Sequence, residues 1–361
     1  MAIELGNYSE DKLKTILKEF KVAQKEYSFK SLTAGYINDT FLVFSEEKPL
    51  FILQRINHNI FENIEGLMMN INSALKYLKG EEYEQIKLIP ALSGKAYASH
   101  KSGYWRVMTY ITNSTTYDNT AEGEIAFEAG RIIGRFHTLL AHEPIALYTD
   151  TIPKFHDLEL RKMQFLAALA RASDKKKEIA KKAILFSKDM LVKLTAMHNS
   201  NLPQRVCHND TKLNNILFSK ETKKALCLID LDTLMTGYFH FDFGDAIRTI
   251  VNTAPEDEQE HSKITFDKNL FEAFLDGLAS NDSFLTPEEI KALPYGVLLM
   301  PFLHGIRALT DYLNGNIYYK VAYENQNLDR CLSLFDFTEK AFSNIDYMRT
   351  VLSEKLKSSR H

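Results

Sequence analysis

Residues 207–215 read Cys-His-Asn-Asp-Thr-Lys-Leu-Asn-Asn. The stretch is polar, and two apolar segments joined by a polar turn follow it, the first ending at Phe218 and the second at Asp230. This pattern predicts a loop that leads into a buried hairpin. Asp210 and Asn215 lie on the loop side of that hairpin. A carboxylate at the end of a buried strand, as at Asp230, is costly unless a cation or hydrogen bonds compensate it.

These three residues meet the needs of phosphoryl transfer. A carboxylate must orient and deprotonate the acceptor hydroxyl, while oxygen ligands, including a second carboxylate, hold magnesium against the phosphates. Asp210 precedes Asn215 by five positions, which is the spacing of the base and the metal-binding asparagine in a kinase catalytic loop. We therefore predict that Asp210 is the catalytic base and that Asn215 and Asp230 are metal ligands.

A second candidate for the metal carboxylate is Asp242, because residues 242–244 read Asp-Phe-Gly. In the kinase arrangement the metal-binding Asp directly follows a buried strand after the catalytic loop. Asp230 meets that condition, whereas Asp242 follows a turn rich in aromatic residues. We interpret Asp242 and Asp245 as structural or acceptor-binding acids at the start of a helix, where the helix dipole favours negative charge.

Composition narrows the class of protein. The 361 residues are 45% hydrophobic and 25% charged, as in ordinary folded proteins, and the net charge of -3 does not favour a nucleic-acid partner. The N-terminus lacks the basic and apolar parts of a signal peptide, and the apolar stretch around residues 297–303 is too short to cross a bilayer. Three widely spaced cysteines indicate reduced thiols. We expect a cytoplasmic protein with no membrane partner, and the sequence leaves its oligomeric state open.

Periodicity predicts an α+β protein. The first third is typical of strands around one helix, and the rest is mainly helical. We expect a small β-rich lobe over residues 1–112 and a larger helical lobe over residues 113–361. Helices are expected at 11–20, 60–77, 157–171 and 176–198, and strands at 27–29, 40–44, 50–55 and within 86–111. Gly130 and Gly134 share one predicted helix and indicate a close helix packing contact.

The pattern His-x-Asp-x-x-x-x-Asn, followed by a buried strand that ends in Ile-Asp, resembles the aminoglycoside phosphotransferase and choline kinase superfamily, relatives of the protein kinases. Further blocks look like the N-acetylhexosamine 1-kinases. The blocks are residues 34–41, 53–57, 208–215, 229–233, 242–248 and 307–315. The resemblance implies a bilobal protein-kinase-like fold that binds ATP and Mg²⁺.

The resemblance also implies a set of nucleotide-binding residues. The turn around Gly35 would cover the triphosphate with the hydroxyl of Thr33 or Thr40, although a single glycine between strands is usually only a hairpin turn. The third strand has Gln54-Arg55 where the superfamily normally places a phosphate-binding lysine. Arg55 could supply that charge, and strand alternation leaves open which of the two residues does so. Met108 and Tyr110 would lie beside the adenine.

For the acceptor, the resemblance implies phosphorylation of the anomeric hydroxyl of N-acetylglucosamine or N-acetylgalactosamine, a small-molecule sugar, to give the 1-phosphate. The sugar contacts that the resemblance implies are Asp39, Asp245, Arg307 and Tyr318. Two other functions stay open. One is a kinase of another small hydroxyl acceptor, such as choline, ethanolamine or an aminoglycoside, and the other is a non-catalytic kinase-like binding protein.

Overall fold

The computed structural model describes residues 8–32, 37–198 and 201–356. The predicted nucleotide-binding positions Thr33 and Gly35 lie outside the described residues. The chain forms two compact units, and neither is one continuous stretch of sequence. The N-terminal unit contains Met1–Ser114, His142–Pro153 and Leu231–Met235, and the C-terminal unit contains Thr115–Ala141, Lys154–Asp230 and Thr236–His361.

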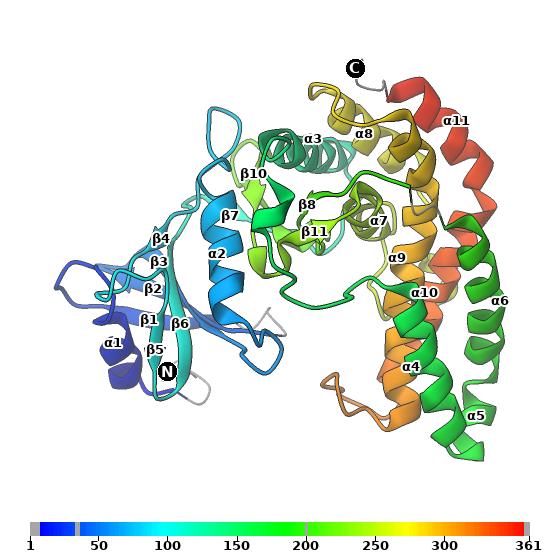
Figure 1. The fold of residues 1–361 in the computed structure, drawn as a ribbon, viewed down its shortest axis with the longest axis horizontal. Helices are drawn as coiled ribbons and strands as arrows, with labels where there is room; N and C mark the ends of the chain where they lie inside the picture. The colour runs from blue at the N-terminus through cyan, green and yellow to red at the C-terminus, as the bar shows by residue number, and fades with distance from the viewer. Residues whose placement is uncertain (1–7, 33–36, 199–200, 357–361) are drawn as a thin grey trace. The chain divides into compact units, whose positions relative to one another are not determined.

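An antiparallel sheet forms the body of the N-terminal unit (Figure 1). Its strands are ordered β1-β2-β3-β6-β4, and β5 also pairs with β6. The strands are β1 (Ser28–Leu32), β2 (Asp39–Ser45), β3 (Lys48–Ile56), β4 (Leu88–Ile89), β5 (Ala98–His100) and β6 (Gly103–Thr109). Successive side chains along each strand point to opposite faces of the sheet, so neighbours in sequence have different surroundings.

Apolar side chains on one face of this sheet form the core of the N-terminal unit. Phe41 and Trp105 stack on one another, with ring centres 6.2 Å apart. Helix α1 (Glu10–Leu17) adds its buried residues Leu13 and Ile16 to the same cluster. The predicted amphipathic segment at 11–20 is therefore a helix, and it ends earlier than expected.

Helix α2 (Ile64–Ala74) attaches two later segments of chain to the N-terminal unit. Its buried Asn70 donates hydrogen bonds of 2.7 Å to the backbone carbonyls of both Thr149 and Leu234. The side-chain oxygen of Asn70 accepts a hydrogen bond of 3.0 Å from the N–H of Thr149. Asn70 thus satisfies backbone groups that loops would otherwise leave unpaired.

The C-terminal unit is mainly helical, with short strands between the helices (Figure 1). Its helices are α3 (Gly123–Leu139), α4 (Leu158–Arg171), α5 (Asp174–Ile179), α6 (Lys181–Met197), α7 (Phe239–Ile250), α8 (Lys268–Ala279), α9 (Pro287–Asn314), α10 (Gln326–Ser343) and α11 (Ile345–Lys355). Its strands are β8 (Arg205–Cys207), β9 (Ile216–Ser219) and β10 (Ala225–Leu228). The chain passes from one unit to the other within β7 (Ser114–Thr115) and again within β11 (Met235–Gly237).

This arrangement confirms the predicted α+β class, with an antiparallel sheet near the N-terminus and a helical C-terminal part. The predicted hairpin after the catalytic loop is also present, since β9 and β10 pair antiparallel. One helix was expected over residues 176–198, but the structure has two, α5 and α6, because Ala180 leaves helical geometry between them.

Helix α9 is long and apolar enough to cross a membrane by length and composition alone. Most of it is buried in the C-terminal unit, where it packs against α4, α7 and α10. The helix continues through Pro294 and Pro301, so the apolar stretch around residues 297–303 belongs to a longer element than the sequence indicated. Packing inside the unit accounts for its apolar character.

Helices α3 and α8 pack with their backbones in direct contact. A Cβ atom at Gly130 would lie 2.0 Å from the carbonyl oxygen of Phe274, and one at Gly277 would lie 1.8 Å from the carbonyl oxygen of Phe127. Both distances are far below van der Waals contact, so only glycine fits at either position. The helix packing contact predicted at Gly130 is confirmed.

We therefore expect Gly277→Ala to lower the free energy of unfolding by about 3 kcal/mol, because the added methyl group must push the two helices apart. Chemical denaturation followed by circular dichroism measures this change. Gly123→Ala is the matched control, since a Cβ there would meet only the side chain of Ala273, at an ordinary 3.8 Å. Equal stability of Gly277→Ala and the wild type would contradict the proposed contact.

Candidate active site

The catalytic loop begins directly after β8 and passes through the short 3-10 turn η2 (Leu213–Asn215) into β9. Two residues near it have left-handed backbone, Asn209 with a φ of 63° and Asp230 with a φ of 59°. Asn and Asp tolerate this conformation better than most side chains, yet it is uncommon outside glycine. Backbone strain of this kind concentrates at functional sites.

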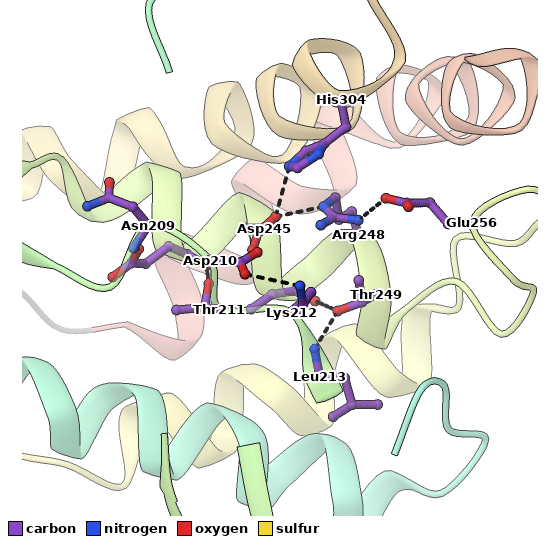
Figure 2. A network of polar contacts seen from close by, with 12 residues as sticks. Asn209, Asp210, Thr211, Lys212, Leu213, Asp245, Arg248, Thr249, Glu256 and His304 are labelled. Atoms are coloured by element: carbon purple, nitrogen blue, oxygen red, sulfur yellow. Dashed lines mark hydrogen bonds and ion pairs between the residues drawn. The ribbon is translucent and has the colours of Figure 1, made fainter. Parts of the chain in front are cut away.

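The carboxylate of Asp210 lies within a small polar cluster (Figure 2). Its Oδ2 accepts a hydrogen bond of 2.8 Å from Nδ2 of Asn215 and pairs with the Lys212 ammonium at 3.0 Å. The same Nδ2 also donates to the backbone carbonyl of Asp210 at 2.8 Å. Because these bonds use the amide nitrogen of Asn215, its amide oxygen can serve as a ligand.

His208 connects the loop to the strand that leads to Asp230. Its Nδ1 accepts a hydrogen bond of 3.3 Å from the N–H of Asp210, so Nε2 carries the proton and donates to the carbonyl of Ile229 at 2.8 Å. The N–H of Ile229 donates in turn to the carbonyl of Asn215 at 2.8 Å. The chain before Asp230 is thus held against the catalytic loop.

Electrostatics keep the carboxyl of Asp210, the predicted base, ionised. Burial raises the pKa of the Asp210 carboxyl, but the charge and hydrogen bond of the Lys212 ammonium, together with His208, outweigh burial and hold that pKa below its usual value. Burial would lower the pKa of Lys212, but the carboxylates of Asp210 and Asp230 raise it overall. Both partners are therefore charged at neutral pH, which suits Asp210 for accepting a proton.

Asp242 fixes the backbone of the same loop. Its side chain is fully buried in the first turn of α7, and its two carboxylate oxygens accept hydrogen bonds from the N–H groups of His208 and Asn209, at 2.9 and 2.6 Å. Nε2 of His137 lies 2.9 Å from the same carboxylate. These contacts agree with the interpretation of Asp242 as a structural acid.

Asp245, one turn further along α7, lies beside Asp210 (Figure 2). Its Oδ1 pairs with Arg248 at 2.7 Å and lies 3.4 Å from Nε2 of His304, and Arg248 also pairs with Glu256 at 2.6 Å. The other oxygen, Oδ2, is buried and has no hydrogen-bond partner among the described residues. A buried carboxylate oxygen without a donor is costly, so a substrate hydroxyl would satisfy it.

Two arginines of the C-terminal unit, Arg161 and Arg307, pair with no carboxylate in the described part of the chain. Arg307 lies over the ring of Phe155, with 5.4 Å from the guanidinium carbon to the ring centre. The next residue, His156, donates from Nε2 to the carbonyl of Asn209 at 3.0 Å. Burial lowers the pKa of His156 to about 4, and the charge of Arg307 acts in the same direction.

Tyr318 lies in a loop that Asp311, near the end of α9, holds in place. The carboxylate of Asp311 accepts hydrogen bonds from the N–H groups of Ile317, Tyr318 and Tyr319, at 2.9, 2.9 and 3.0 Å. The side chain of Tyr318 is 58% exposed, and both tyrosines act electrostatically on Arg161. A fixed backbone thus presents an exposed aromatic ring near a cation.

In the N-terminal unit, Asp39 and Arg55 contact each other, although the resemblance gives them different roles. Nη1 of Arg55 pairs with Asp39 at 2.9 Å, and its Nε donates to the carbonyl of Ser102 at 2.8 Å. The Tyr8 hydroxyl also donates to Asp39, at 3.0 Å. The role of Asp39 in acceptor binding and that of Arg55 in phosphate binding stay predictions.

The remaining predicted nucleotide residues belong to the sheet. The Thr40 hydroxyl accepts a hydrogen bond of 2.9 Å from Nε2 of Gln54. Met108 lies on β6 between β3 and β4, and Tyr110, just after β6, donates its N–H to the carbonyl of Leu50 at 3.0 Å. Their contact with a nucleotide stays a prediction.

Sequence reasoning missed four residues that interact with the predicted site residues or with their neighbours. They are Arg106, His156, Arg161 and His304. None belongs to a recognisable motif, and each gains its neighbours only through folding. Arg106 is opposite Gln54 in the β3–β6 register and pairs with Asp232. Strand pairing could have suggested the first contact, but the sequence carries no local sign of the second.

A comparison with known protein families identifies the family of this chain. The model of the phosphotransferase enzyme family (APH) matches residues 28–281, well over half of the chain. The chain belongs to this family.

Solved structures resemble this phosphotransferase along nearly its whole length. A spectinomycin phosphotransferase in complex with ADP and spectinomycin is 13% identical, with 94% of this chain and 99% of that chain covered and a TM-score of 0.63. A microcompartment-associated aminopropanol kinase is 16% identical, with coverage of 93% and 97% and a TM-score of 0.61. An amicoumacin kinase with AMP-PNP and Ca²⁺ is 14% identical, with coverage of 98% and 96% and a TM-score of 0.56. These likenesses confirm the predicted protein-kinase-like fold.

The buried histidine of this phosphotransferase predicts a pH dependence of stability. His156 has a pKa of about 4 in the folded state and an ordinary value of 6.5 when unfolded, so the unfolded chain binds more protons in that interval. Stability should therefore fall as the pH decreases through it. Between about pH 7.5 and about pH 5, the wild type should lose roughly 2 kcal/mol more than His156→Gln, which keeps a donor for the Asn209 carbonyl. Urea denaturation at both pH values measures the difference, and parallel losses would contradict the prediction.

Proposed function

We propose that the chain is an ATP-dependent kinase that phosphorylates the anomeric hydroxyl of N-acetylglucosamine or N-acetylgalactosamine to give the 1-phosphate. The observation that carries the phosphoryl-transfer part is the cluster of Asp210, Lys212 and Asn215, in which an ionised carboxylate is held by an ammonium and an amide. The family supports the reaction class. The sugar acceptor is supported by the sequence resemblance and by the charges near the base.

The oxygen donors present suit Mg²⁺, which is usually bound through one or two carboxylates and substrate phosphates. We propose Asn215, through its amide oxygen, and Asp230 as the ligands. The charge of Asp230 acts on Lys212, the partner of the base, so this carboxylate is within electrostatic reach of Asp210. Magnesium would neutralise charge on the phosphates during transfer. The relatives solved with ADP, and with AMP-PNP and Ca²⁺, support a nucleotide and a divalent cation.

In the proposed reaction, Asp210 takes the proton of the acceptor hydroxyl while that oxygen bonds to the γ-phosphorus of ATP. The bond from the γ-phosphorus to its bridging oxygen breaks, and ADP leaves with the electron pair. The anomeric hydroxyl is the most acidic hydroxyl of a sugar, so a carboxylate of low pKa suffices to orient it and accept its proton.

The charges around the base favour a neutral acceptor over a cationic one. Asp245 pairs with Arg248, and Glu256 pairs with both Arg248 and Arg330, so two guanidinium charges offset the two carboxylates. Arg161 and Arg307 add positive charge that no carboxylate of the described residues pairs with. A polycationic antibiotic or an amino alcohol would be repelled by these arginines. The hydroxyl and acetyl oxygens of an N-acetylated sugar can instead accept hydrogen bonds from them.

Three residues of the C-terminal unit are proposed to contact the sugar. The unpartnered Oδ2 of Asp245 would accept a hydrogen bond from a sugar hydroxyl, Arg307 would donate to sugar oxygens, and the exposed ring of Tyr318 would pack on the sugar. Asp39 is also proposed as a sugar contact, on the resemblance alone. For the nucleotide we keep the proposed set Thr33, Gly35, Thr40, Arg55, Met108 and Tyr110.

The acceptor is tested by measuring ADP release with Mg²⁺ and ATP in the presence of N-acetylglucosamine, N-acetylgalactosamine, glucose, galactose, choline or an aminoglycoside. We expect release with the N-acetylated sugars and a phosphorus NMR signal for an anomeric phosphate. Release only with choline or the aminoglycoside would overturn the sugar proposal. Absence of release with every acceptor would favour a kinase-like binding protein.

The base is tested by Asp210→Asn, which keeps the size of the side chain and removes the proton acceptor. We expect kcat to fall about 1000-fold, because general-base catalysis contributes on that order. Binding of Mg²⁺-ATP, measured by calorimetry without acceptor, should change little. An Asp210→Asn protein with near wild-type turnover would show that another group is the base.

Lys212→Met tests the electrostatic effect on that base. Loss of the ammonium should raise the pKa of Asp210, since Lys212 is the strongest of the groups that lower it. The acid limb of the kcat/KM profile should therefore move to higher pH. The control is Lys220→Met, at an exposed turn residue, which should leave the profile unchanged. An acid limb that does not move in Lys212→Met would show that Lys212 does not set the pKa of the base.

A further inference from the structure

Strand β6 of the N-terminal unit carries a buried arginine to which no motif assigns a role. The side chain of Arg106 is 2% exposed and faces Gln54 in the β3–β6 register. Its Nε and Nη2 both donate to Oε1 of Gln54, at 2.9 and 2.5 Å. Its Nη1 pairs with the carboxylate of Asp232, which is 3% exposed. Burying such a pair is favourable only where geometry and further hydrogen bonds compensate the loss of water.

The partners of Arg106 extend into a wider network within the N-terminal unit. The second carboxylate oxygen of Asp232 accepts a hydrogen bond of 2.7 Å from Nδ2 of Asn38. The side-chain oxygen of Asn38 accepts one of 2.9 Å from the N–H of Asn57, at the end of β3. The network therefore joins β6 and β3 to the chain just before β2 and to the turn η3 (Leu231–Thr233).

Two of these contacts lie next to predicted nucleotide and metal positions. Asp232 is two residues beyond Asp230, the proposed metal carboxylate, and Asn38 is three residues beyond Gly35, in the turn expected to cover the triphosphate. Through Asp232, Arg106 is thus linked to residues that are close in sequence to both predicted positions.

The network also places a positive charge beside β3, the strand on which the superfamily normally has a phosphate-binding lysine. Gln54 and Arg55 point to opposite faces of the sheet. On one face Arg55 is paired with Asp39, while on the other Gln54 contacts Arg106. The cation on the Gln54 face therefore comes from the neighbouring strand.

We propose that Arg106 is a positioning residue of the nucleotide site, which together with Gln54 and Asp232 takes the part of the missing lysine. It keeps Asp232 and Asn38 in place for a magnesium-bound triphosphate. Its fixed positive charge also offsets the Asp232 carboxylate, which would otherwise repel the phosphates. The proposal rests on the ATP-dependent function proposed above.

The test measures binding of Mg²⁺-ATP and of adenosine to the full chain by calorimetry, without acceptor. Arg106→Gln should weaken Mg²⁺-ATP binding at least tenfold and leave adenosine binding within about twofold, because only the phosphate and metal part is affected. The double variant Gln54→Lys with Arg106→Gln returns a cation to β3 and should regain most of the lost affinity. A purely structural role would lower both affinities together and would not respond to the relocated charge.

Arg131→Gln is the matched control, since it breaks another largely buried arginine–carboxylate pair, with Glu128 at 2.7 Å, in the C-terminal unit. It should lower the thermal stability without changing the ratio of the two affinities. If Arg106→Gln does not fold, Gln54→Met removes an acceptor of Arg106 without leaving a charge unpaired, and it should weaken Mg²⁺-ATP binding about fivefold.

The proposal is overturned if the folded variant binds Mg²⁺-ATP as the wild type does, or if both ligands weaken equally. A wild-type chain that binds no Mg²⁺-ATP would instead refute the proposed function itself, so the two failures are distinguishable.

Discussion

The hydrogen bonds to the Asp242 carboxylate are the constraint on which the catalytic loop depends. A fully buried carboxylate needs donors, and the backbone N–H groups of His208 and Asn209 supply two of them. Helix α7, which carries Asp242, lies in backbone contact with α9, where a Cβ at Gly244 would come 2.1 Å from the carbonyl oxygen of Gly296. Helix packing thus sets the place of one carboxylate, and that carboxylate sets the path of the loop.

Three acids close together in the C-terminal unit therefore have distinct surroundings. Asp242 has both oxygens bonded to the loop and holds backbone. Asp245 has one oxygen paired with Arg248 and the other unpartnered among the described residues. Asp210 is buried, yet its pKa stays below the usual value because Lys212 and the other groups that lower it together outweigh burial. The three side chains are chemically identical, so the donors around each carboxylate are what distinguish the proposed structural acid, substrate contact and base.

The sequence predicted what depends on short stretches of chain. Asp210 and Asn215 lie within one loop, so their spacing alone placed them together, and the structure brings their side chains into contact. Alternating or helical periodicity indicated the sheet and most helices. The sequence did not predict contacts that depend on strand register and helix packing. Arg106 meets Gln54 through strand pairing and Asp232 through a separation of 126 positions. The break at Ala180 was missed because alanine favours helix and carries no stop signal.

The N-terminal unit is assembled from three separate stretches of chain, and this has a consequence for biosynthesis. Domains generally fold as the ribosome releases them, N-terminal parts first. Here the sheet emerges long before Leu234 and Asp232, whose contacts with Asn70 and Arg106 complete the unit. Arg106 of the nascent sheet therefore lacks its counter-ion, Asp232, until much of the helical unit has also been translated. Completion of the N-terminal unit therefore depends on synthesis of much of the C-terminal unit.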